Sequence, residues 1–327
     1  MAHSIRITAV GHALPDVVLS NDEVVERFGL EVDAAWIEER TGIRSRHWLA
    51  EGQTTSDLAV EAARAILDRR GITARDLDRI LLATSSPDYP SPATATIVAR
   101  KLGARCAALD FSAACAAFPY GLDLAAGAVR GGDRHVLLLC ADARSRYIDK
   151  RDRRSVVLFA DGAGGALLEP SEDPGLLSVA LGSECLEDLG AWIPAGGAAQ
   201  PISHEAIDRG EHFLHVDGMR EIFTRFAAYT CEASEQALAK AGIGLGDVDL
   251  FVTHQGNANL VRAIVERLGI DPARAVNGVA EHGNTSGATI PIALSEAWSE
   301  GRVPAGSTVL FASAGAGYVF GAAVHRF

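Results

Sequence analysis

The chain has 327 residues, of which 48% are hydrophobic and 22% are charged, which is enough for a large globular core or about two ordinary domains. A net charge of −12 with no block of like charges excludes nucleic acid as a main partner, because phosphate binding needs a basic face. The five cysteines are scattered and form no CxxC pair, so we expect neither a disulfide framework nor a metal site. The sequence has no signal-peptide-like start and no run of about 18 apolar residues, so we expect a cytoplasmic protein without a membrane span.

An alternation of helices and short apolar strands predicts an α/β protein. An apolar helical pattern at 61–67 ends near Gly71, and a buried strand at 80–84 follows. A second short strand leads into Cys115, and the apolar spacing at 118–129 predicts a helix directly after it. The N–H groups and the dipole at a helix start favour a thiolate, so Cys115 is a candidate nucleophile. The alternative is a buried structural cysteine.

The middle of the chain contains the expected boundary between two halves. The glycine-rich run 162–165 lacks the lysine and serine of a phosphate loop and lies between apolar runs, so it predicts a hairpin or close strand packing. Prolines at 170 and 174 divide the chain into an N-terminal half, 1–172, and a C-terminal half, 173–327. The segment 190–210 is rich in Gly, Ala and Pro and predicts a long loop of the kind that is often functional.

The second half repeats the pattern of the first. The segment Glu61–Asp76 has a counterpart in Glu232–Asp247, at an offset of 171 residues (232 minus 61), and an apolar strand follows each copy. A second similarity joins Val157–Ala160 to Val309–Ala312, and each of these precedes a glycine-rich run. Two such halves predict an internal pseudo-two-fold.

Polar residues follow the predicted elements of the second half. His254 comes directly after the strand 250–253, and Asn284 lies in the polar run 281–288, before another helix. Ligand sites of open α/β sheets form beyond the carboxyl ends of strands, so both residues are candidates for a site. The alternatives are a core histidine and a turn or cap asparagine.

The repeat predicts that these residues meet the cysteine. Pro119 lies four residues after Cys115, and Pro291 lies four residues after Gly287. If the prolines correspond, Cys115 and the run 284–286 occupy equivalent places that a two-fold brings together. A thiolate, a histidine and an amide donor in one pocket are the working set of thiol acyl chemistry.

Four segments resemble motifs of the β-ketoacyl-acyl-carrier-protein synthase III family, which has the thiolase fold, and the resemblance covers essentially the whole chain. They are the nucleophile motif Asp110–Phe118, the HQxN motif His254–Asn257, the HGNTS motif His282–Ser286 and the segment Trp36–Arg44. The resemblance implies a layered αβαβα fold. It also implies a homodimer that acts on acyl-CoA and acyl carrier protein and needs no metal or redox cofactor.

The resemblance further implies a triad of Cys115, His254 and Asn284. The cysteine takes an acyl group from a coenzyme A thioester. The other two residues then bind the thioester carbonyl of malonyl-carrier-protein and stabilise the enolate that forms as carbon dioxide leaves. That carbanion attacks the acyl-enzyme and gives a β-ketoacyl product. Backbone amides of Cys115 and Ala316 are expected to hold the oxyanion of the acyl step. Contacts to coenzyme A are expected from Trp36, Arg40, Arg153 and Asn257.

Two positions depart from the family pattern. Ala314 stands where many members have a phenylalanine that gates the nucleophile. Asn259 stands where an arginine often docks the carrier protein, and Arg262, one turn further on, is the candidate substitute.

The expected acyl pocket is unusual. Its candidate residues are Ser85, Ser91, Arg144, Arg146 and Ser286. Ser91 stands where some relatives place a bulky residue from the partner subunit, and Arg144 replaces an aliphatic residue. An arginine there would bind a distal carboxylate in bidentate fashion, so we expect a dicarboxylic primer such as glutaryl-CoA. This resembles the family branch that makes 3-oxopimeloyl-carrier-protein for biotin synthesis. The alternative places Arg144 in solvent, within a basic patch at 144–154.

Three other functions are compatible with the same residues. The protein could transfer an acyl group to an alcohol or amine without decarboxylation, as in secondary metabolism. It could be a thioesterase, or a non-catalytic acyl-CoA-binding protein. Carbon dioxide release identifies condensation, whereas coenzyme A release without a stable acyl-enzyme identifies a thioesterase. A binding protein would form no adduct on Cys115.

Overall fold

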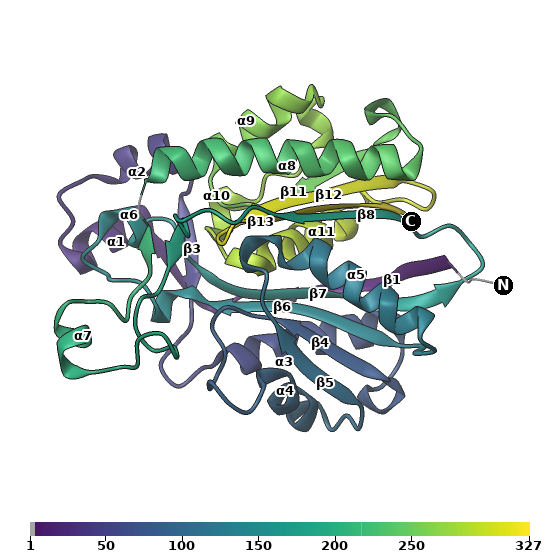
Figure 1. Cartoon of the computed structure of the whole chain (residues 1–327), viewed down its shortest axis with the longest axis horizontal. Helices are drawn as coiled ribbons and strands as arrows, with labels where there is room; N and C mark the ends of the chain where they lie inside the picture. Colours follow the sequence, from purple (N-terminus) through teal and green to yellow (C-terminus); the bar gives the residue numbers. More distant parts are fainter. Residues whose placement is uncertain (1–3, 217) are drawn as a thin grey trace.

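The computed structural model describes residues 4–216 and 218–327, which form two mixed sheets (Figure 1). The first has the order β1-β7-β6-β4-β5 and the second has the order β11-β12-β13-β8. The strands of the first sheet are β1 (Ser4–Ala13), β4 (Arg79–Ala83), β5 (Ala107–Phe111), β6 (Val136–Ala143) and β7 (Asp161–Ser171). Those of the second are β8 (Leu176–Ser183), β11 (Leu250–Thr253), β12 (Thr308–Gly315) and β13 (Val319–Arg326). β4 runs parallel to β5 and β6, and β11 runs parallel to β12, while the other pairs are antiparallel.

Helices form three further layers, which confirms the αβαβα arrangement of a thiolase-like fold (Figure 1). α3 (Thr55–Arg70) and α4 (Thr94–Leu102) cover the outer face of the first sheet, and α8 (Met219–Ala241) and α9 (Ala258–Leu268) cover that of the second. α5 (Ala117–Arg130) and α11 (Thr289–Ser299) lie between the sheets. Most residues of α11 are buried, because a helix between two sheets has no solvent face. Phe118 and Phe311 meet edge to face across this shared core, at 5.3 Å between ring centroids.

The repeat at an offset of 171 residues is confirmed. α3 ends at Gly71 and α8 ends at Gly242, both in the left-handed conformation that favours glycine, with φ of 75° and 70°. A short 3₁₀ turn and then β4 or β11 follows in each half. The chain crosses from the first sheet to the second between β7 and β8.

The structural correspondence predicted from the second sequence similarity, between Val157–Ala160 and Val309–Ala312, is wrong. Val157–Ala160 is an irregular segment before β7, whereas Val309–Ala312 lies within β12. The counterpart of β12 is β6, because each pairs in parallel with the strand that follows the repeated helix. The prediction for 162–165 is confirmed, since this run is part of β7. A Cβ on Gly165 would lie 2.2 Å from the Leu138 carbonyl oxygen, so only glycine allows that approach.

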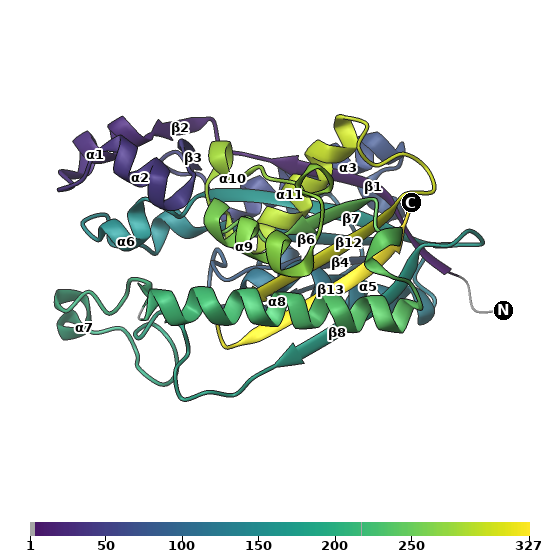
Figure 2. The same ribbon diagram turned by 90° about the horizontal axis from the view of Figure 1, so that it is seen from above.

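The remaining elements cap the end of the molecule opposite the two termini (Figures 1 and 2). They are β2 (Val17–Ser20), α1 (Asn21–Phe28), α2 (Ala34–Thr41), β3 (Ser45–Trp48), α6 (Arg153–Val156), β9 (Ala191–Trp192), α7 (His204–Asp208), β10 (His215–Val216) and α10 (Val279–His282). The segment 190–210 is therefore not an unstructured loop. Its start pairs with β10, and α7 lies within it. None of the helices in the described ranges has both the length and the apolarity to cross a membrane.

Candidate active site

Cys115 lies in a 3₁₀ turn, Ala114–Ala116, directly before α5. The turn starts from Ala114 in the left-handed region, at φ 44°. The end of β12 holds it, because the Ser313 hydroxyl donates to the Cys115 carbonyl at 2.6 Å. Gly315 approaches so closely that a Cβ there would lie 2.7 Å from the Cys115 nitrogen. The half-buried cysteine of the first half is therefore fixed by the end of β12 in the second half.

The thiol is not the stabilised thiolate that its place at a helix start suggests. Burial, together with the charge of the nearby Asp142 carboxylate, raises the pKa of Cys115 to about 11. The charge of Arg144 and a hydrogen bond from Ser286 act in the opposite direction but do not compensate. The desolvation of the thiolate thus outweighs the stabilisation that a helix start gives to a negative charge, and Cys115 is a thiol near neutral pH.

We expect the alkylation of Cys115 by iodoacetamide to accelerate about tenfold per pH unit between pH 7 and pH 9, because the thiolate is the reactive form and its pKa lies above this range. Mass spectrometry of the digested protein measures the rate, with the exposed Cys185 as the internal control for reagent quality. A Cys115 rate that levels off below pH 8 would show a lowered pKa and contradict this assignment.

His254 follows β11, and its ring is almost completely buried. Its Nδ1 lies 2.7 Å from Thr289 Oγ1, at the start of α11. Burial lowers the pKa of His254 to about 4, so the ring is neutral near pH 7. A Cβ on Gly256 would lie 2.6 Å from His254 Nε2 and 3.4 Å from Asn284 Nδ2. These two nitrogen atoms therefore converge on one place, and the absence of a side chain on Gly256 leaves that place open.

Asn284 is held in place by the first half. Its N–H donates to the Leu158 carbonyl and its carbonyl accepts from the Ala160 N–H, both at 2.9 Å. Its side-chain Oδ1 accepts the Ser286 N–H at 2.9 Å, which leaves the two Nδ2 hydrogens for the cavity. Ser286 has φ 56° and begins the 3₁₀ turn before α11, as Ala114 begins the turn before α5. The predicted equivalence of the two turns is present in the structure.

A cavity of about 370 Å³, called here the acyl cavity, brings the predicted chemical groups together. The predicted residues that line it are Ser85, Cys115, Arg144, His254, Asn257, Asn284, Ser286 and Ala316. Its apolar wall comprises Leu158, Phe159, Trp192, Ile193, Leu214, Val216, Met219, Ile222, Phe223, Phe226 and Leu260. Cys115 and the two converging nitrogen donors thus share one largely apolar cavity. The described residues include no group of three or more His, Cys, Asp or Glu side chains arranged to hold a metal.

Arg144 is buried in this cavity and does not lie in solvent, since it is only 6% exposed. Its Nη1 donates to Ser85 Oγ at 3.1 Å, and Ser85 Oγ donates in turn to Asp142 Oδ1 at 2.8 Å. The guanidinium carbon lies 5.7 Å from the centroid of the Phe159 ring. No carboxylate of the described residues forms an ion pair with Arg144, and its Nε has no hydrogen-bond partner among them. The cavity therefore contains a buried cation that lacks a direct counter-ion.

Two expectations fail for reasons that the structure makes plain, and the expectation for Ser91 concerns a partner subunit. Arg146 is exposed and donates to the Ala50 carbonyl at 2.8 Å, so it does not line the acyl cavity. Ser91 is exposed on the loop before α4 and does not line the cavity of its own chain, so its predicted contribution to the pocket of a partner subunit stays a prediction. Ala314 points into the core between the second sheet and α8, so it does not occupy a gating position beside the thiol.

A second pocket of about 550 Å³, called here the entrance pocket, adjoins the acyl cavity. Leu158, Met219, Phe223 and Asn257 line both. All four predicted coenzyme A contacts lie here: Trp36, Arg40, Arg153 and Asn257. The guanidinium carbons of Arg40 and Arg153 lie 5.6 Å and 5.4 Å from the Trp36 ring centroid. Sequence reasoning missed the first turns of α8, which supply Met219, Arg220 and Phe223, because it recognised that helix only from Glu232 onward.

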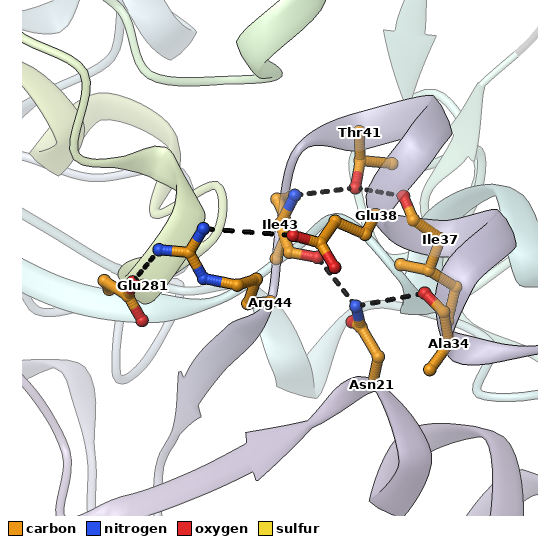
Figure 3. A network of polar contacts seen from close by, with 8 residues as sticks. All are labelled: Asn21, Ala34, Ile37, Glu38, Thr41, Ile43, Arg44 and Glu281. Atoms are coloured by element: carbon orange, nitrogen blue, oxygen red, sulfur yellow. Dashed lines mark hydrogen bonds and ion pairs between the residues drawn. The ribbon is translucent and has the colours of Figure 1, made fainter.

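The helix that carries Trp36 is tied to the segment that carries Asn284 (Figure 3). Arg44, just after α2, forms an ion pair with Glu281 of α10, and its N–H donates to the Ala280 carbonyl. Within the same network, Asn21 donates to the Ile43 carbonyl at 2.8 Å (Figure 3). These contacts fix α2, which lines the entrance pocket, relative to the segment that carries Asn284.

Asn259 has a structural role in this part of the molecule. Its side-chain amide donates to the Arg40 carbonyl at 2.9 Å, and so joins α9 to α2. Arg262 is exposed on α9, one turn away.

Comparison with known proteins identifies the family. The family models for 3-oxoacyl-[acyl-carrier-protein] synthase III and for its C-terminal region match residues 109–185 and 238–327. A β-ketoacyl-[acyl-carrier-protein] synthase III of Symbiobacterium thermophilum is 41% identical over 325 residues, covering 98% of both chains. The chain belongs to the synthase III family. This synthase III is accordingly an acyltransferase of the condensing type.

Solved structures agree with this assignment. The synthase III of Aquifex aeolicus matches with a TM-score of 0.89 and 33% identity, covering 99% of this chain and 100% of that one. The priming β-ketosynthase of the R1128 polyketide biosynthetic pathway matches with a TM-score of 0.91 and 32% identity, covering 99% and 97%. The two regions matched by the family models contain Cys115 in one case and His254 and Asn284 in the other.

Proposed function

We propose that this synthase III loads an acyl group from acyl-CoA onto Cys115 and condenses it with malonyl-carrier-protein. The convergence of His254 Nε2 and Asn284 Nδ2 beside the thiol carries this proposal. In the first step the sulfur of Cys115 displaces coenzyme A, which leaves as its thiol and takes up the cysteine proton. The backbone amides of Cys115 and Ala316, two residues that line the cavity, are proposed to hold the oxyanion of that step.

In the second step the malonyl thioester loses carbon dioxide, and the electron pair of the broken C–C bond becomes an enolate. His254 and Asn284 donate hydrogen bonds to the enolate oxygen. The enolate carbon attacks the acyl-enzyme carbonyl, and Cys115 leaves as a thiolate, which takes a proton from solvent before the next turnover. The largely apolar cavity favours this step, because loss of carbon dioxide from a carboxylate is faster away from water.

We further propose that the primer is a dicarboxylic acyl-CoA such as glutaryl-CoA, with the product serving biotin precursor synthesis. The support is Arg144, a buried guanidinium without a direct counter-ion in the cavity that holds the thiol. A primer that ends in a carboxylate would supply the missing charge.

The entrance pocket is proposed to hold coenzyme A and then the phosphopantetheine arm of the carrier protein. Trp36 lies within reach of two guanidinium groups, a combination that suits an aromatic base and its phosphates. We also propose a homodimer. The edge strand β5 exposes Leu109, and Tyr89 and Leu124 are likewise exposed apolar side chains in the same half.

Intact-mass analysis after exposure to a panel of acyl-CoAs tests the proposal. We expect a single adduct on Cys115, formed faster from glutaryl-CoA than from acetyl-CoA. Equal rates for the two donors would refute the dicarboxylic primer. Subsequent addition of malonyl-carrier-protein should release carbon dioxide and clear the adduct. Transfer without carbon dioxide, loss of the adduct in buffer alone, or no adduct at all would each point to one of the three other functions.

A further inference from the structure

The buried hydroxyl of Thr289 lies behind the His254 ring, away from the acyl cavity. Thr289 begins α11 and is 3% exposed, and its Oγ1 lies 2.7 Å from His254 Nδ1. The other ring nitrogen, Nε2, faces Gly256 and the cavity. The imidazole Nδ1 therefore has a hydrogen-bond partner within the protein, whereas Nε2 faces the cavity where substrate would bind.

The hydrogen bonds behind the ring decide which nitrogen carries the proton. A neutral imidazole has one N–H. If that proton were on Nδ1, Thr289 Oγ1 would accept it, and the hydroxyl hydrogen would be buried without an acceptor. Among the described residues, this hydroxyl has no second hydrogen bond. If the proton is on Nε2, the hydroxyl donates to Nδ1 and every polar hydrogen behind the ring is satisfied.

We propose that Thr289 is a positioning residue that holds His254 as the Nε2–H tautomer. This inference rests on the proposed condensation, in which the thioester oxygen of the malonyl group becomes an enolate oxygen. An enolate oxygen only accepts hydrogen bonds, so it needs the N–H of His254 beside the amide of Asn284. The opposite tautomer would present a lone pair to that oxygen and repel it. The ring proton stays on Nε2 throughout, and Thr289 acts only through the histidine.

Long-range ¹H–¹⁵N correlation spectra of the whole protein at pH 7 test the tautomer directly. The His254 signals can be assigned by comparison with the His254→Gln variant. We expect Nε2 to be protonated and Nδ1 to carry the lone pair. A wild-type spectrum with the proton on Nδ1 overturns the inference. This readout does not depend on turnover, so a wild-type enzyme that fails to condense malonyl-carrier-protein would refute the proposed function and leave the tautomer result standing.

Two variants test the consequence for the reaction. Thr289→Val keeps the shape and removes the hydroxyl, and Thr289→Ser keeps the hydroxyl. We expect Thr289→Val to show both tautomers and to condense roughly 10- to 100-fold more slowly, because a wrongly protonated imidazole cannot serve the reacting oxygen. Acylation of Cys115 should change little, and Thr289→Ser should restore condensation. A Thr289→Val enzyme that keeps the Nε2–H tautomer and full condensation overturns the inference. Should Thr289→Val fail to fold, the wild-type spectrum and the Thr289→Ser rate decide.

Discussion

Replacing Asn284 with aspartate is expected to slow condensation by about 10²- to 10³-fold, the usual cost of losing one oxyanion donor. The variant keeps an oxygen to accept the Ser286 N–H, so the 3₁₀ turn before α11 retains its hydrogen bond. It replaces the two Nδ2 hydrogens, which face the cavity, with an oxygen that cannot donate when ionised. The backbone bonds to Leu158 and Ala160 do not involve the side chain and are preserved.

The Asn284→Asp substitution should lower the rate of the condensation step only. In the proposed mechanism, acylation of Cys115 uses backbone amides and not the Asn284 side chain, so acyl-enzyme should still accumulate in the Asn284→Asp variant. Intact mass measures the acyl-enzyme, and carbon dioxide release from malonyl-carrier-protein measures the second step. Asn277→Asp introduces the same charge at an exposed position nearby and is the matched control. Equal losses in both steps would show that Asn284 has a general structural role and not a specific one toward the enolate.

Replacing Arg144 with leucine is expected to reverse the choice of primer. The preference for glutaryl-CoA over pentanoyl-CoA, which has the same chain length and no terminal charge, should fall by about 10- to 100-fold, because a charge-assisted hydrogen bond contributes about 1.5–3 kcal/mol. A dicarboxylic primer in the variant would bury its carboxylate without a partner, which adds to the loss. The pentanoyl primer should gain, since leucine restores an apolar wall beside Phe159.

The matched control for this change is Arg146→Leu. Arg146 lies two residues away, is exposed and does not line the acyl cavity, so its loss should leave primer choice unchanged. Rates of Cys115 acylation with both donors, measured by intact mass, give the ratio for each variant. The same preference in the wild type and in Arg144→Leu would mean that the guanidinium serves the fold through Ser85 and Asp142, and that the primer is chosen elsewhere.

Sequence patterns predicted the parts of this protein that depend on local spacing. The repeated segment with Gly71 and Gly242 identified equivalent helices and strands, because a helix that ends in a left-handed glycine leaves the same signature wherever it occurs. The equivalence of the turn that carries Cys115 and the turn that begins at Ser286, two residues after Asn284, followed from two prolines. Both inferences needed only neighbours in the sequence.

Other features depended on residues far apart in the chain. The pKa of Cys115 is raised because burial removes the thiol from water and the Asp142 carboxylate disfavours the thiolate, neither of which a helix-start argument includes. Arg144 and Arg146 are two residues apart, yet one is buried and the other exposed. The role assigned to Thr289 depends on its contact with a histidine 35 residues earlier. Burial and long-range contact decide these properties, and neither has a local signature.

Each half of the chain holds the reactive group of the other. Ser313 of the second half binds the carbonyl of Cys115, and Leu158 and Ala160 of the first half bind the backbone of Asn284. A single half on its own would lack the partner that fixes its group. If the two halves descend from one duplicated gene, one copy now carries the thiol and the other carries the amide, and neither group is fixed without the opposite copy.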